Sequence, residues 1–570
     1  MIKRVGEDQV GAPETPQTSV DLFLARYGTD WWRDGIVYQI YPRSYGDTDG
    51  DGVGDLPGII DQLDHLGRDG LGVDGVWLSP IYPSPGFDVG YDVSDHAAVD
   101  PLLGTEDDFD RLVREAHDRG LRVILDLVMN HTSDRHAWFQ ASRASREGPY
   151  ADYYLWRDPS GHDGEGRPLP PNNWLSFFGG SAWRYEPARG QFYMHTFLVE
   201  QPEVNWRNPA VEEAQLAMVR GWLDRGVDGF RLDVFNIFLK DAEMPSNPEL
   251  EGEAGTSAWD RQEHKYDRDQ PDFPDLIARF RAIVDEVPGR MSVGELFYGG
   301  PETSATLSNQ NHLVFDWELV RAPWSAEEYR GLLDRRQTIF GDDIWPTVVL
   351  SNHDQSRHAS RLSASAGIED TDAIARAAAA ILFTLRGTPF LYYGEEIGLC
   401  DVEVPFEEII DPPARRVEEG WVWWNRDACR SPMPWTGEPG HGFTTGRPWI
   451  RFGDDADTRN VAAQVTDPAS VLGAYKRLIA LRHDRPSLRH GSLRRQEIGG
   501  PDVLAYMRAA DGEQTLVVAN FATADTTVDL APAGGGVWRP VGGSHVQPVA
   551  PDGTRSLALR GLEVVILERG

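Results

Sequence analysis

The sequence predicts an α/β fold, a (β/α)8 TIM barrel with an inserted subdomain after strand 3 and a C-terminal antiparallel β-sandwich domain. Short apolar, β-branched runs alternate with amphipathic helical stretches along most of the chain, as in βα units around a parallel sheet. Eight such runs occur, and eight is the number of strands in a closed barrel of this kind. From about Gly491 onward, short alternating runs without helical stretches indicate an antiparallel sheet.

The predicted elements follow the chain in order. The eight barrel strands are Ile36–Tyr41, Val73–Leu78, Arg122–Val128, Val227–Leu232, Met291–Gly294, Leu313–Phe315, Thr347–Leu350 and Thr388–Tyr393. The clearest helices, each with apolar residues at spacings of three and four, are Glu106–Arg119, Pro209–Arg225, Pro274–Val287 and Thr371–Thr384. The predicted strands of the C-terminal domain are Val503–Met507, Gln514–Ala519, Thr526–Leu530 and Val564–Leu567.

Three insertions in the βα repeat set the predicted domain organisation. The predicted parts are an N-terminal extension (1–30), the catalytic barrel (31–131 and 206–488), subdomain B (132–205) and the C-terminal β domain (489–570). The two insertions inside the barrel are loops at 240–272 and 400–464. All three insertions follow predicted strands, so we expect them above the carboxyl ends of the barrel strands, where barrel enzymes place their sites.

The charge balance excludes two classes of partner. The chain has 570 residues and a formal net charge of -35, which repels nucleic acids and anionic membranes and suits a neutral small-molecule substrate. No run approaches the roughly 18 apolar residues of a membrane span, and residues 1–27 lack a basic start followed by an apolar core. Two cysteines, Cys400 and Cys429, fit a reducing compartment. We therefore expect a cytoplasmic protein, with no prediction of its oligomeric state.

An acidic loop follows the first predicted strand. Its carboxylates alternate with glycines, as Asp47, Asp49, Asp51 and Asp55 with Val53 among them. Such a loop can wrap a hard cation with oxygen ligands, and no His or Cys joins the cluster. These five residues therefore predict a structural Ca²⁺ or Mg²⁺ remote from the chemistry. The alternative is an acidic surface turn.

A second set of carboxylates ends three of the predicted barrel strands. Asp233 ends the fourth strand two residues after Arg231, so both side chains lie on one side of an extended chain. A neighbouring guanidinium favours the ionised carboxylate that a nucleophile requires. Glu295 closes the fifth strand and Asp354 the seventh. Glycoside cleavage needs one carboxylate to attack the anomeric carbon and one carboxylic acid to protonate the leaving oxygen.

Several motifs surround these acids. They are Asp126-Leu-Val-Met-Asn130-His131, Gln201-Pro-Glu203-Val-Asn205, Gly229-Phe-Arg231-Leu-Asp233, Gly294-Glu295, Asn352-His353-Asp354, Gly387–Glu396 and Arg426–Trp435. Together they resemble the motifs of glycoside hydrolase family 13, the α-amylase family, and of its oligo-1,6-glucosidase branch. Recognisable similarity runs from Asp34 to about Leu488, so the resemblance covers most of the chain.

The resemblance implies a role for each matching residue. Asp233 would be the nucleophile that forms a β-glucosyl-enzyme, and Glu295 would be the general acid/base. Asp354 would hold the 2- and 3-hydroxyls of the sugar, and His131 and His353 would bond hydroxyls in the same subsite.

Further residues of the resemblance concern the end of the substrate chain. Asp88 and Tyr91 would grip the terminal glucose, and Arg231 would poise the nucleophile. Arg430 would pair with Asp88 and block the subsite beyond it, so that the site becomes a pocket for chain ends. Val234, directly after the nucleophile, implies a preference for α-1,6 bonds.

The implied function is a retaining, exo-acting α-glucosidase that releases terminal non-reducing glucose from isomaltose and short isomalto-oligosaccharides without an organic cofactor. An α-1,4-acting maltase, a transglycosylating α-glucosidase, a trehalose synthase and a sucrose isomerase stay open, because all share the covalent intermediate. A catalytically dead barrel that acts as an interaction protein is the alternative outside enzymes. All the acids and both histidines are present, which argues against it.

The chain departs from the family pattern in three places. Ser356 replaces a proline of many relatives and leaves the orientation of Arg357 open. Glu203 and Val204 replace the usual Asp and Leu, which is a mild change. The loop 240–272 carries no recognisable motif, and we expect it to shape the aglycone side of the site, where the leaving group or acceptor lies.

Overall fold

The computed structural model describes residues 28–250, 258–415, 425–551 and 555–569. Only the last three residues of the predicted N-terminal extension (1–30) fall inside these ranges. The described part contains all eight predicted barrel strands. They are β1 (Val37–Ile40), β2 (Gly75–Leu78), β3 (Arg122–Leu127), β9 (Gly229–Leu232), β10 (Met291–Gly294), β11 (Leu313–Val314), β12 (Thr347–Val349) and β13 (Thr388–Tyr392).

These strands form one parallel sheet in the order β11-β10-β9-β3-β2-β1-β13-β12. The barrel closes between β11 and β12 through a side chain, since the described residues of these two strands share no backbone ladder. The hydroxyl of Thr347 donates to the carbonyl of Val314 at 3.3 Å and accepts from the N–H of Asp316 at 3.0 Å. The prediction of a (β/α)8 barrel is confirmed.

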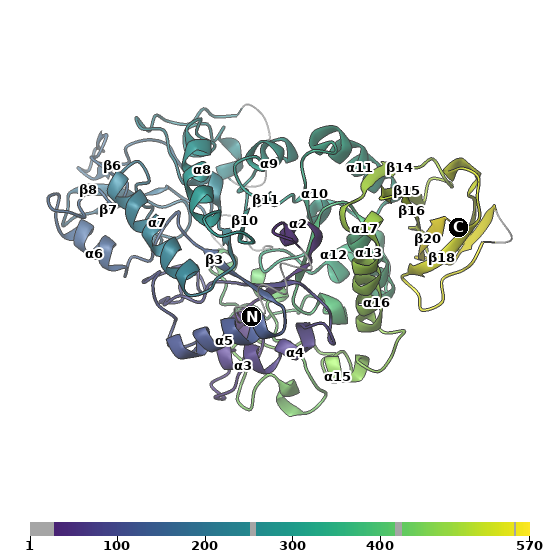
Figure 1. Cartoon of the computed structure of the whole chain (residues 1–570). Coiled ribbons are helices and arrows are strands. Elements are labelled where there is room, and N and C mark those ends of the chain that lie inside the picture. Colours follow the sequence, from purple (N-terminus) through teal and green to yellow (C-terminus); the bar gives the residue numbers. More distant parts are fainter. Residues whose placement is uncertain (1–27, 251–257, 416–424, 552–554, 570) are drawn as a thin grey trace, which may run out of the picture.

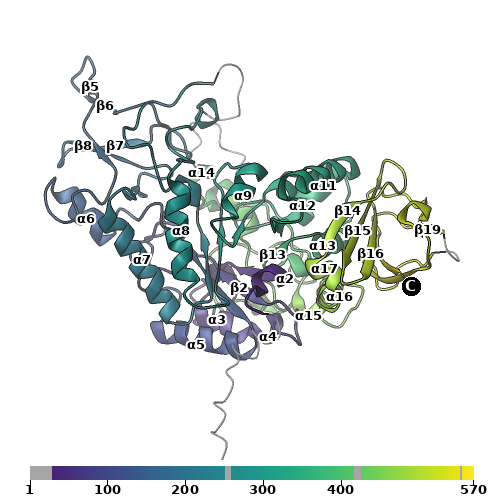
Figure 2. The ribbon, with the colours of Figure 1, turned by 45° about the horizontal axis from the view of Figure 1, so that its top comes forward.

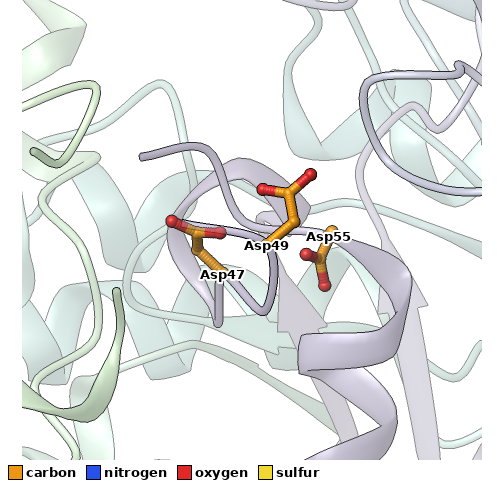
Figure 3. A group of neighbouring side chains, drawn as sticks. All are labelled: Asp47, Asp49 and Asp55. Atoms are coloured by element: carbon orange, nitrogen blue, oxygen red, sulfur yellow. The ribbon is translucent and has the colours of Figure 1, made fainter. Parts of the chain in front are cut away.

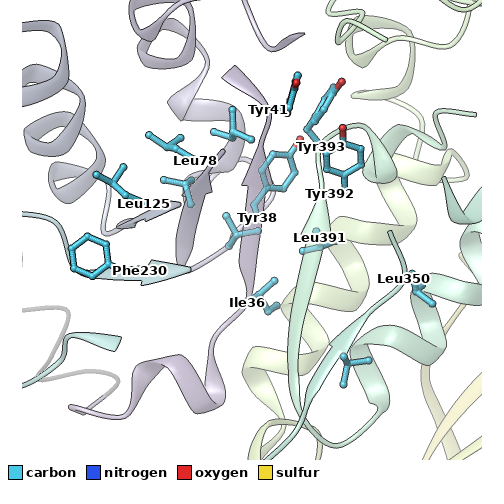
Figure 4. Packing of buried hydrophobic residues seen from close by; sticks show 14 of the residues in the cluster. Ile36, Tyr38, Tyr41, Leu78, Leu125, Phe230, Leu350, Leu391, Tyr392 and Tyr393 are labelled. Atoms are coloured by element: carbon cyan, nitrogen blue, oxygen red, sulfur yellow. The ribbon is translucent and has the colours of Figure 1, made fainter. Parts of the chain in front are cut away.

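Alternate residues of the strands pack on two sides of the barrel wall. Val37, Trp77 and Ile124 belong to a cluster inside the barrel. Their strand neighbours Tyr38 and Leu125 belong to the larger cluster between the strands and the helices, part of which Figure 4 shows. Side chains near the carboxyl ends that share the inward parity therefore point into the barrel mouth.

The four predicted helices are present and surround the strands (Figure 1). They are α5 (Glu106–Asp118), α7 (Pro209–Asp224), α8 (Phe273–Val284) and α13 (Thr371–Thr384). Thr105 and Asp108 form a capping box at the start of α5, and the side chain of Asp370 caps α13. Such caps satisfy backbone N–H groups that have no partner inside the helix.

The insertion after β3 lies at one end of the molecule (Figure 2). It contains α6 (Ala137–Ala144) and a small sheet of β4 (Trp156–Arg157), β8 (Gln191–Met194) and β7 (Trp183–Glu186). Its last segment returns to the barrel, where Glu203 pairs with His131 in a backbone bridge. Lys240 lies 2.7 Å from the carboxylate of Glu203, and both side chains are buried. This ion pair joins the insertion to the loop that follows the strand of Asp233.

The C-terminal domain lies at the opposite end, beside α11 (Ala326–Phe340), α13 and α16 (Val471–Asp484) (Figures 1 and 2). Its antiparallel strands form a five-stranded and a two-stranded sheet over a separate core. They are β14 (Ser492–Arg495), β15 (Val503–Ala510), β16 (Glu513–Asn520), β20 (Val564–Arg569) and β18 (Trp538–Gly543), with β17 (Thr526–Asp529) paired to β19 (Ser556–Leu559). The alternating pattern predicted β15, β16, β17 and β20. It missed β14, β18 and β19.

Two simpler expectations concern the cysteines and membranes. Cys400 and Cys429 are both free thiols. Among the described helices, none has the length and apolar character needed to cross a membrane.

Candidate active site

A pocket of about 150 Å³ opens at the carboxyl ends of the barrel strands. Of the predicted catalytic and substrate-binding residues, the ones that line it are Asp88, Tyr91, His131, Asp233, Val234, Glu295 and Asp354. Arg231, His353 and Arg430 do not line it and are buried behind its wall. Segments up to 338 residues apart in the chain (Asp88 to Arg426) thus meet in one pocket.

One guanidinium holds three carboxylates together at the base of the pocket. Nη1 of Arg231 lies 2.8 Å from Asp126 Oδ1 and 2.6 Å from Asp233 Oδ1. Its Nη2 contacts Oε2 of Glu295. Asp126, Arg231 and Glu295 come from or directly follow the adjacent strands β3, β9 and β10, so strand pairing fixes the geometry. The contact between Arg231, in β9, and Asp233, directly after it, confirms the prediction that both side chains lie on one side of the extended chain.

Burial raises the pKa of Glu295 to about 8, although the charge of Arg231 opposes this rise. The negative charges of Asp233 and Asp354 raise it further. Glu295 is therefore protonated near neutral pH, the state that a general acid needs.

The nucleophile candidate does not have the lowered pKa that we expected. Burial raises the pKa of Asp233, and the charge of Arg231 lowers it only in part. The physical reason is that one guanidinium is shared among Asp126, Asp233 and Glu295 in a buried site.

Val234 joins the two central acids through its backbone. It has φ 38° and ψ 41°, a left-handed conformation that β-branched residues rarely adopt. Its N–H donates to Oε2 of Glu295 at 3.3 Å. Next to Glu295, a Cβ at Gly294 would lie 2.5 Å from the ring of Phe235. Only glycine fits there, which explains the Gly294-Glu295 motif.

Asp88 forms an ion pair in the pocket wall, but with Arg426. Nη2 of Arg426 lies 2.7 Å from Oδ1 of Asp88, and Gln201 donates to its Oδ2 at 3.0 Å. The prediction that Arg430 pairs with Asp88 was wrong. Arg426 is the first residue of the 3-10 helix η7 (Arg426–Cys429), and Arg430 directly follows this helix. Asp411 fixes Arg426 by accepting from its Nε at 2.8 Å.

Arg430 instead lies beneath Asp354. Its Nη2 is 3.1 Å from Asp354 Oδ1, and its Nε donates to the carbonyl of His353 at 2.9 Å. Arg426 also contacts Asp354 Oδ1, at 3.3 Å. Although burial acts in the opposite direction, His353 and these two arginines hold the pKa of Asp354 well below its usual range. Asp354 is thus a permanent anion that can accept hydrogen bonds from sugar hydroxyls.

The two predicted histidines differ in access. His131 lines the pocket, and its Nε2 lies 3.2 Å from the side-chain nitrogen of Gln201. His353 stacks on the ring of Tyr91 with centroids 5.1 Å apart, and Tyr91 donates to Asp126 at 3.0 Å. His353 therefore supports the wall, and the hydroxyl of Tyr91 is held inside it.

The departure at Ser356 does not disturb Arg357. The hydroxyl of Ser356 donates to Asp401, which also accepts the N–H of Arg357 at 2.8 Å. The guanidinium of Arg357 is buried and donates to the carbonyl of Tyr393 at 2.7 Å. It points into the core beside Tyr392 and Tyr393, away from the pocket lining.

The acidic loop ahead of α3 (Leu56–Asp61) brings together three of its predicted ligands (Figure 3). Asp47, Asp49 and Asp55 each offer a carboxylate oxygen, and these oxygens lie within 4.8 Å of one another. Asp51 is not in this group; it is exposed and accepts the N–H of Val53 at 2.7 Å. The carboxylates of Asp47 and Asp55 also accept backbone N–H groups of the loop.

The sequence motifs missed a large part of the pocket. The unpredicted lining residues are Phe177, Phe178, Phe197, Leu296, Phe297, Tyr298, Trp317, Val320, Arg321, Asn352, Gln355 and Arg426. Asn352 and Arg426 lie inside the family motifs, so the motifs carry the signal that could have identified them. The aromatic residues come from separate segments and share no local pattern. Trp259 of the loop 240–272 packs against Phe177, Phe297 and Tyr298.

Comparisons with known proteins identify relatives of this chain. A family model of the alpha amylase catalytic domain matches residues 39–491, and one of the maltogenic amylase C-terminal domain matches residues 497–566. The chain is 42% identical over 519 residues to a "Probable alpha-glucosidase" of Rhizobium meliloti (strain 1021), covering 88% of this chain and 91% of that protein. It is 37% identical over 543 residues to an "Oligo-1,6-glucosidase" of Heyndrickxia coagulans, covering 88% and 94%. The solved alpha-glucosyl transfer enzyme XgtA matches 95% of this chain and 99% of its own, with a TM-score of 0.87 and 41% identity.

Proposed function

The chain belongs to the alpha-amylase family of glycoside hydrolases, and on that premise we propose that it is a retaining, exo-acting α-glucosidase with a preference for α-1,6 bonds. Its substrates would be isomaltose and short isomalto-oligosaccharides, from which it releases the terminal non-reducing glucose. Its relatives include an oligo-1,6-glucosidase and a probable α-glucosidase, which supports this choice.

The observation that carries the proposal is the meeting of Asp233, Glu295 and Asp354 in one pocket beside the Asp88–Arg426 ion pair. A pocket whose wall is closed by a buried ion pair admits the end of a sugar chain and excludes its middle. The charged groups around Asp354 match a ring with several hydroxyls, since each hydroxyl can donate to a carboxylate or accept from an arginine.

A double displacement needs one carboxylate and one carboxylic acid, and Asp233 and Glu295 would take these two roles. Asp233 attacks the anomeric carbon while protonated Glu295 gives its proton to the leaving oxygen. The sugar is then held as an ester on Asp233. In the second step the Glu295 carboxylate takes a proton from water, the water oxygen attacks the same carbon, and the bond to Asp233 breaks. The released glucose keeps the α configuration.

Val234 supports the linkage preference. It lines the pocket next to Asp233 and packs with Phe177 and Phe297. A stiff, branched apolar side chain there crowds a sugar attached through O4, whereas a sugar attached through O6 has an additional rotatable bond and can turn away.

A second candidate function is glucosyl transfer. The solved relative XgtA is described as an alpha-glucosyl transfer enzyme, and water competes with other hydroxyls for the same intermediate. An α-1,4-acting maltase is the main alternative in linkage.

We also propose that Asp47, Asp49 and Asp55 hold a structural Ca²⁺ or Mg²⁺. The proximity of their oxygens supports this site, because hard cations prefer clustered oxygen ligands. The cation would stabilise the loop by binding its three carboxylates, and it would take no part in bond cleavage.

A product profile on isomaltose, maltose, trehalose, sucrose and kojibiose tests the proposed function. We expect glucose as the main product and the highest kcat/KM on isomaltose. A higher kcat/KM on maltose would assign the enzyme to the maltases, and rearranged disaccharides as main products would assign it to the isomerases.

A further inference from the structure

Gln39 is a buried polar residue of the barrel interior that no step of the proposed mechanism uses. It belongs to β1, where its backbone pairs with Trp77 of β2 and with Tyr392 of β13. Its side chain has the inward parity of Val37, two residues earlier, and it is 1% exposed. A polar side chain inside a barrel needs a hydrogen-bonding partner there to offset its burial.

The amide of Gln39 reaches one ring nitrogen of His353. The amide nitrogen lies 2.8 Å from Nδ1 of His353 and 3.1 Å from the hydroxyl oxygen of Ser79, which directly follows β2. The rings of Tyr91 and Tyr41 stack with the imidazole, with centroids 5.1 and 6.1 Å away. These rings hold the plane of the imidazole, so each of its two nitrogens keeps one neighbour.

The other ring nitrogen of His353 faces Asp354. Nε2 lies 3.2 Å from Oδ2 of Asp354, whereas Oδ1 of the same carboxylate faces Arg426 and Arg430. The carboxylate is thus oriented from two sides. Because Asp354 keeps its negative charge, the nitrogen next to Oδ2 must carry a proton in order to be attracted.

His353 has a single proton to place. Burial lowers its pKa to about 3; the charge of Asp354 opposes this shift, and nearby arginines add to it. The imidazole is therefore neutral near pH 7. A proton on Nε2 leaves Nδ1 as a bare acceptor, and Nδ1 is the atom that the amide of Gln39 contacts. With the amide reversed, its carbonyl would draw the proton to Nδ1 and leave a lone pair of Nε2 against the anion of Asp354, which would repel it.

We propose that Gln39 is a positioning residue for glycoside cleavage: its amide donates to Nδ1 of His353 and so holds the ring N–H on Nε2, facing Asp354. This rests on the proposed function, in which Asp354 holds sugar hydroxyls. The contacts run from β1, through the imidazole, to the carboxylate. Since β1 is paired on both sides, it fixes Asp354 before a sugar binds, and the site need not rearrange during bond cleavage.

The first test locates the proton and needs no turnover. In protein labelled with ¹⁵N-histidine, protonated and bare imidazole nitrogens have widely separated ¹⁵N shifts. The signals of His353 are those that disappear in His353→Asn. We expect a protonated Nε2 and a bare Nδ1 between about pH 6 and pH 8, well above the pKa of His353. A proton on Nδ1 overturns the proposal.

The second test asks whether this hydrogen bond acts on the substrate. Gln39→Met keeps the length of the side chain and removes its N–H. The substrates are 4-nitrophenyl α-glucoside and its 2-deoxy analogue, which lacks one of the hydroxyls that Asp354 would hold. We expect the preference in kcat/KM for the first substrate to fall about tenfold in the variant, the order of effect that one hydrogen bond to a charged group has. The Nδ1 signal should move towards that of a nitrogen without a hydrogen bond.

Gln215→Met is the matched control. Gln215 is also 1% exposed, but it lies on α7 and does not line the pocket, so its preference should equal that of the wild type. A general loss of packing lowers kcat/KM on both substrates alike. A Gln39→Met variant with the wild-type preference therefore overturns the proposal, and Gln39→Leu is measured in its place if that variant does not fold. If the wild type hydrolyses neither glucoside, the proposed function fails, while the ¹⁵N spectrum still shows where the proton lies.

Discussion

The N–H of Val234 donates to Oε2 of Glu295 at 3.3 Å, and it does so from a left-handed backbone with φ 38°. The residue after the candidate nucleophile therefore has two structural roles. Its side chain lines the pocket, and its backbone helps to place the acid/base. A substitution at this position changes both the pocket lining and the backbone contact with Glu295, unless the new side chain has the same branching and volume.

Val234→Thr separates the two effects, because Thr is also β-branched and has nearly the same volume. We expect kcat/KM on maltose relative to isomaltose to rise by about tenfold, in line with the roughly 1–3 kcal/mol of a methyl-sized contact. Initial rates on the two disaccharides measure it. Val234→Gly is the contrasting variant. Glycine adopts the left-handed backbone without strain but leaves it free to move. The N–H at this position should then hold Glu295 less firmly, so kcat should fall on both substrates. A wild type that already prefers maltose would refute the linkage assignment.

Asp233→Asn should remove nearly all turnover and leave the melting temperature close to that of the wild type. The amide cannot form the glucosyl ester, while its shape preserves the packing. Retention is checked by NMR on the wild type, where α-glucose should form first and then mutarotate. First-formed β-glucose would show that the two acids act by a single displacement.

The pH dependence of kcat/KM should fall on the alkaline side at about pH 8. Glu295 must be protonated to act as general acid, and burial raises its pKa to about 8. The protonated form of Glu295 therefore predominates below this pH and is lost as the pH rises through it. Glu295→Gln should lose this limb with α-glucosyl fluoride as donor, because fluoride leaves without a proton. An alkaline limb that persists in this variant would belong to another group.

Glu395 offers a second pH effect, on stability. It begins the 3-10 helix η4 (Glu395–Ile397) after β13 and is fully buried, and burial raises its pKa to about 8. A raised carboxyl pKa contributes stability below the unfolded value of about 4.3, and this is lost as the pH rises through 8. Between pH 4 and pH 8 the wild type should therefore lose free energy of unfolding that Glu395→Gln keeps. The difference between the two proteins should change by on the order of 4 kcal/mol in favour of the variant. Parallel profiles of melting temperature against pH for the two proteins would refute this.

Asp49→Ala should lower the melting temperature in the presence of Ca²⁺ and remove its dependence on the metal. Saturation at about 100 times the dissociation constant stabilises a fold by roughly 2.7 kcal/mol. Asp51→Ala is the control, because Asp51 lies outside the group of three oxygens. If chelation leaves the wild type unchanged, the loop is an acidic turn held by its own backbone hydrogen bonds.

The barrel could be predicted because each strand carries its own signal. Buried parallel strands are short apolar runs, and the predicted Met291–Gly294 coincides with β10. The C-terminal strands were harder. β18 contains Pro540 and two glycines, residues that usually mark strand ends, and it bends between Pro540 and Gly542.

The central acids could be predicted because each sits at a strand end inside a motif. The partner of Asp88 could not, since Arg426 and Arg430 lie one turn apart and sequence spacing does not say which one faces the pocket. The aromatic residues that line the pocket could not be predicted for a different reason. Phe177 and Phe297 lie 120 residues apart and meet only when the insertion after β3 folds over the barrel.

The seam between β11 and β12 has a consequence for motion. Those strands lead to Trp317 and to the loop of Asp354, on two sides of the pocket. Among the described residues, two side chains link these segments, whereas all other neighbouring strands share a ladder. They are the hydroxyl of Thr347 and the buried guanidinium of Arg336, which pairs with Asp316 and donates to the carbonyl of Thr347 at 3.0 Å. Side-chain contacts hold two strands less continuously than a backbone ladder does. We therefore expect local opening of the barrel wall to begin at this seam, while β9 and β10, which precede Asp233 and Glu295, stay paired.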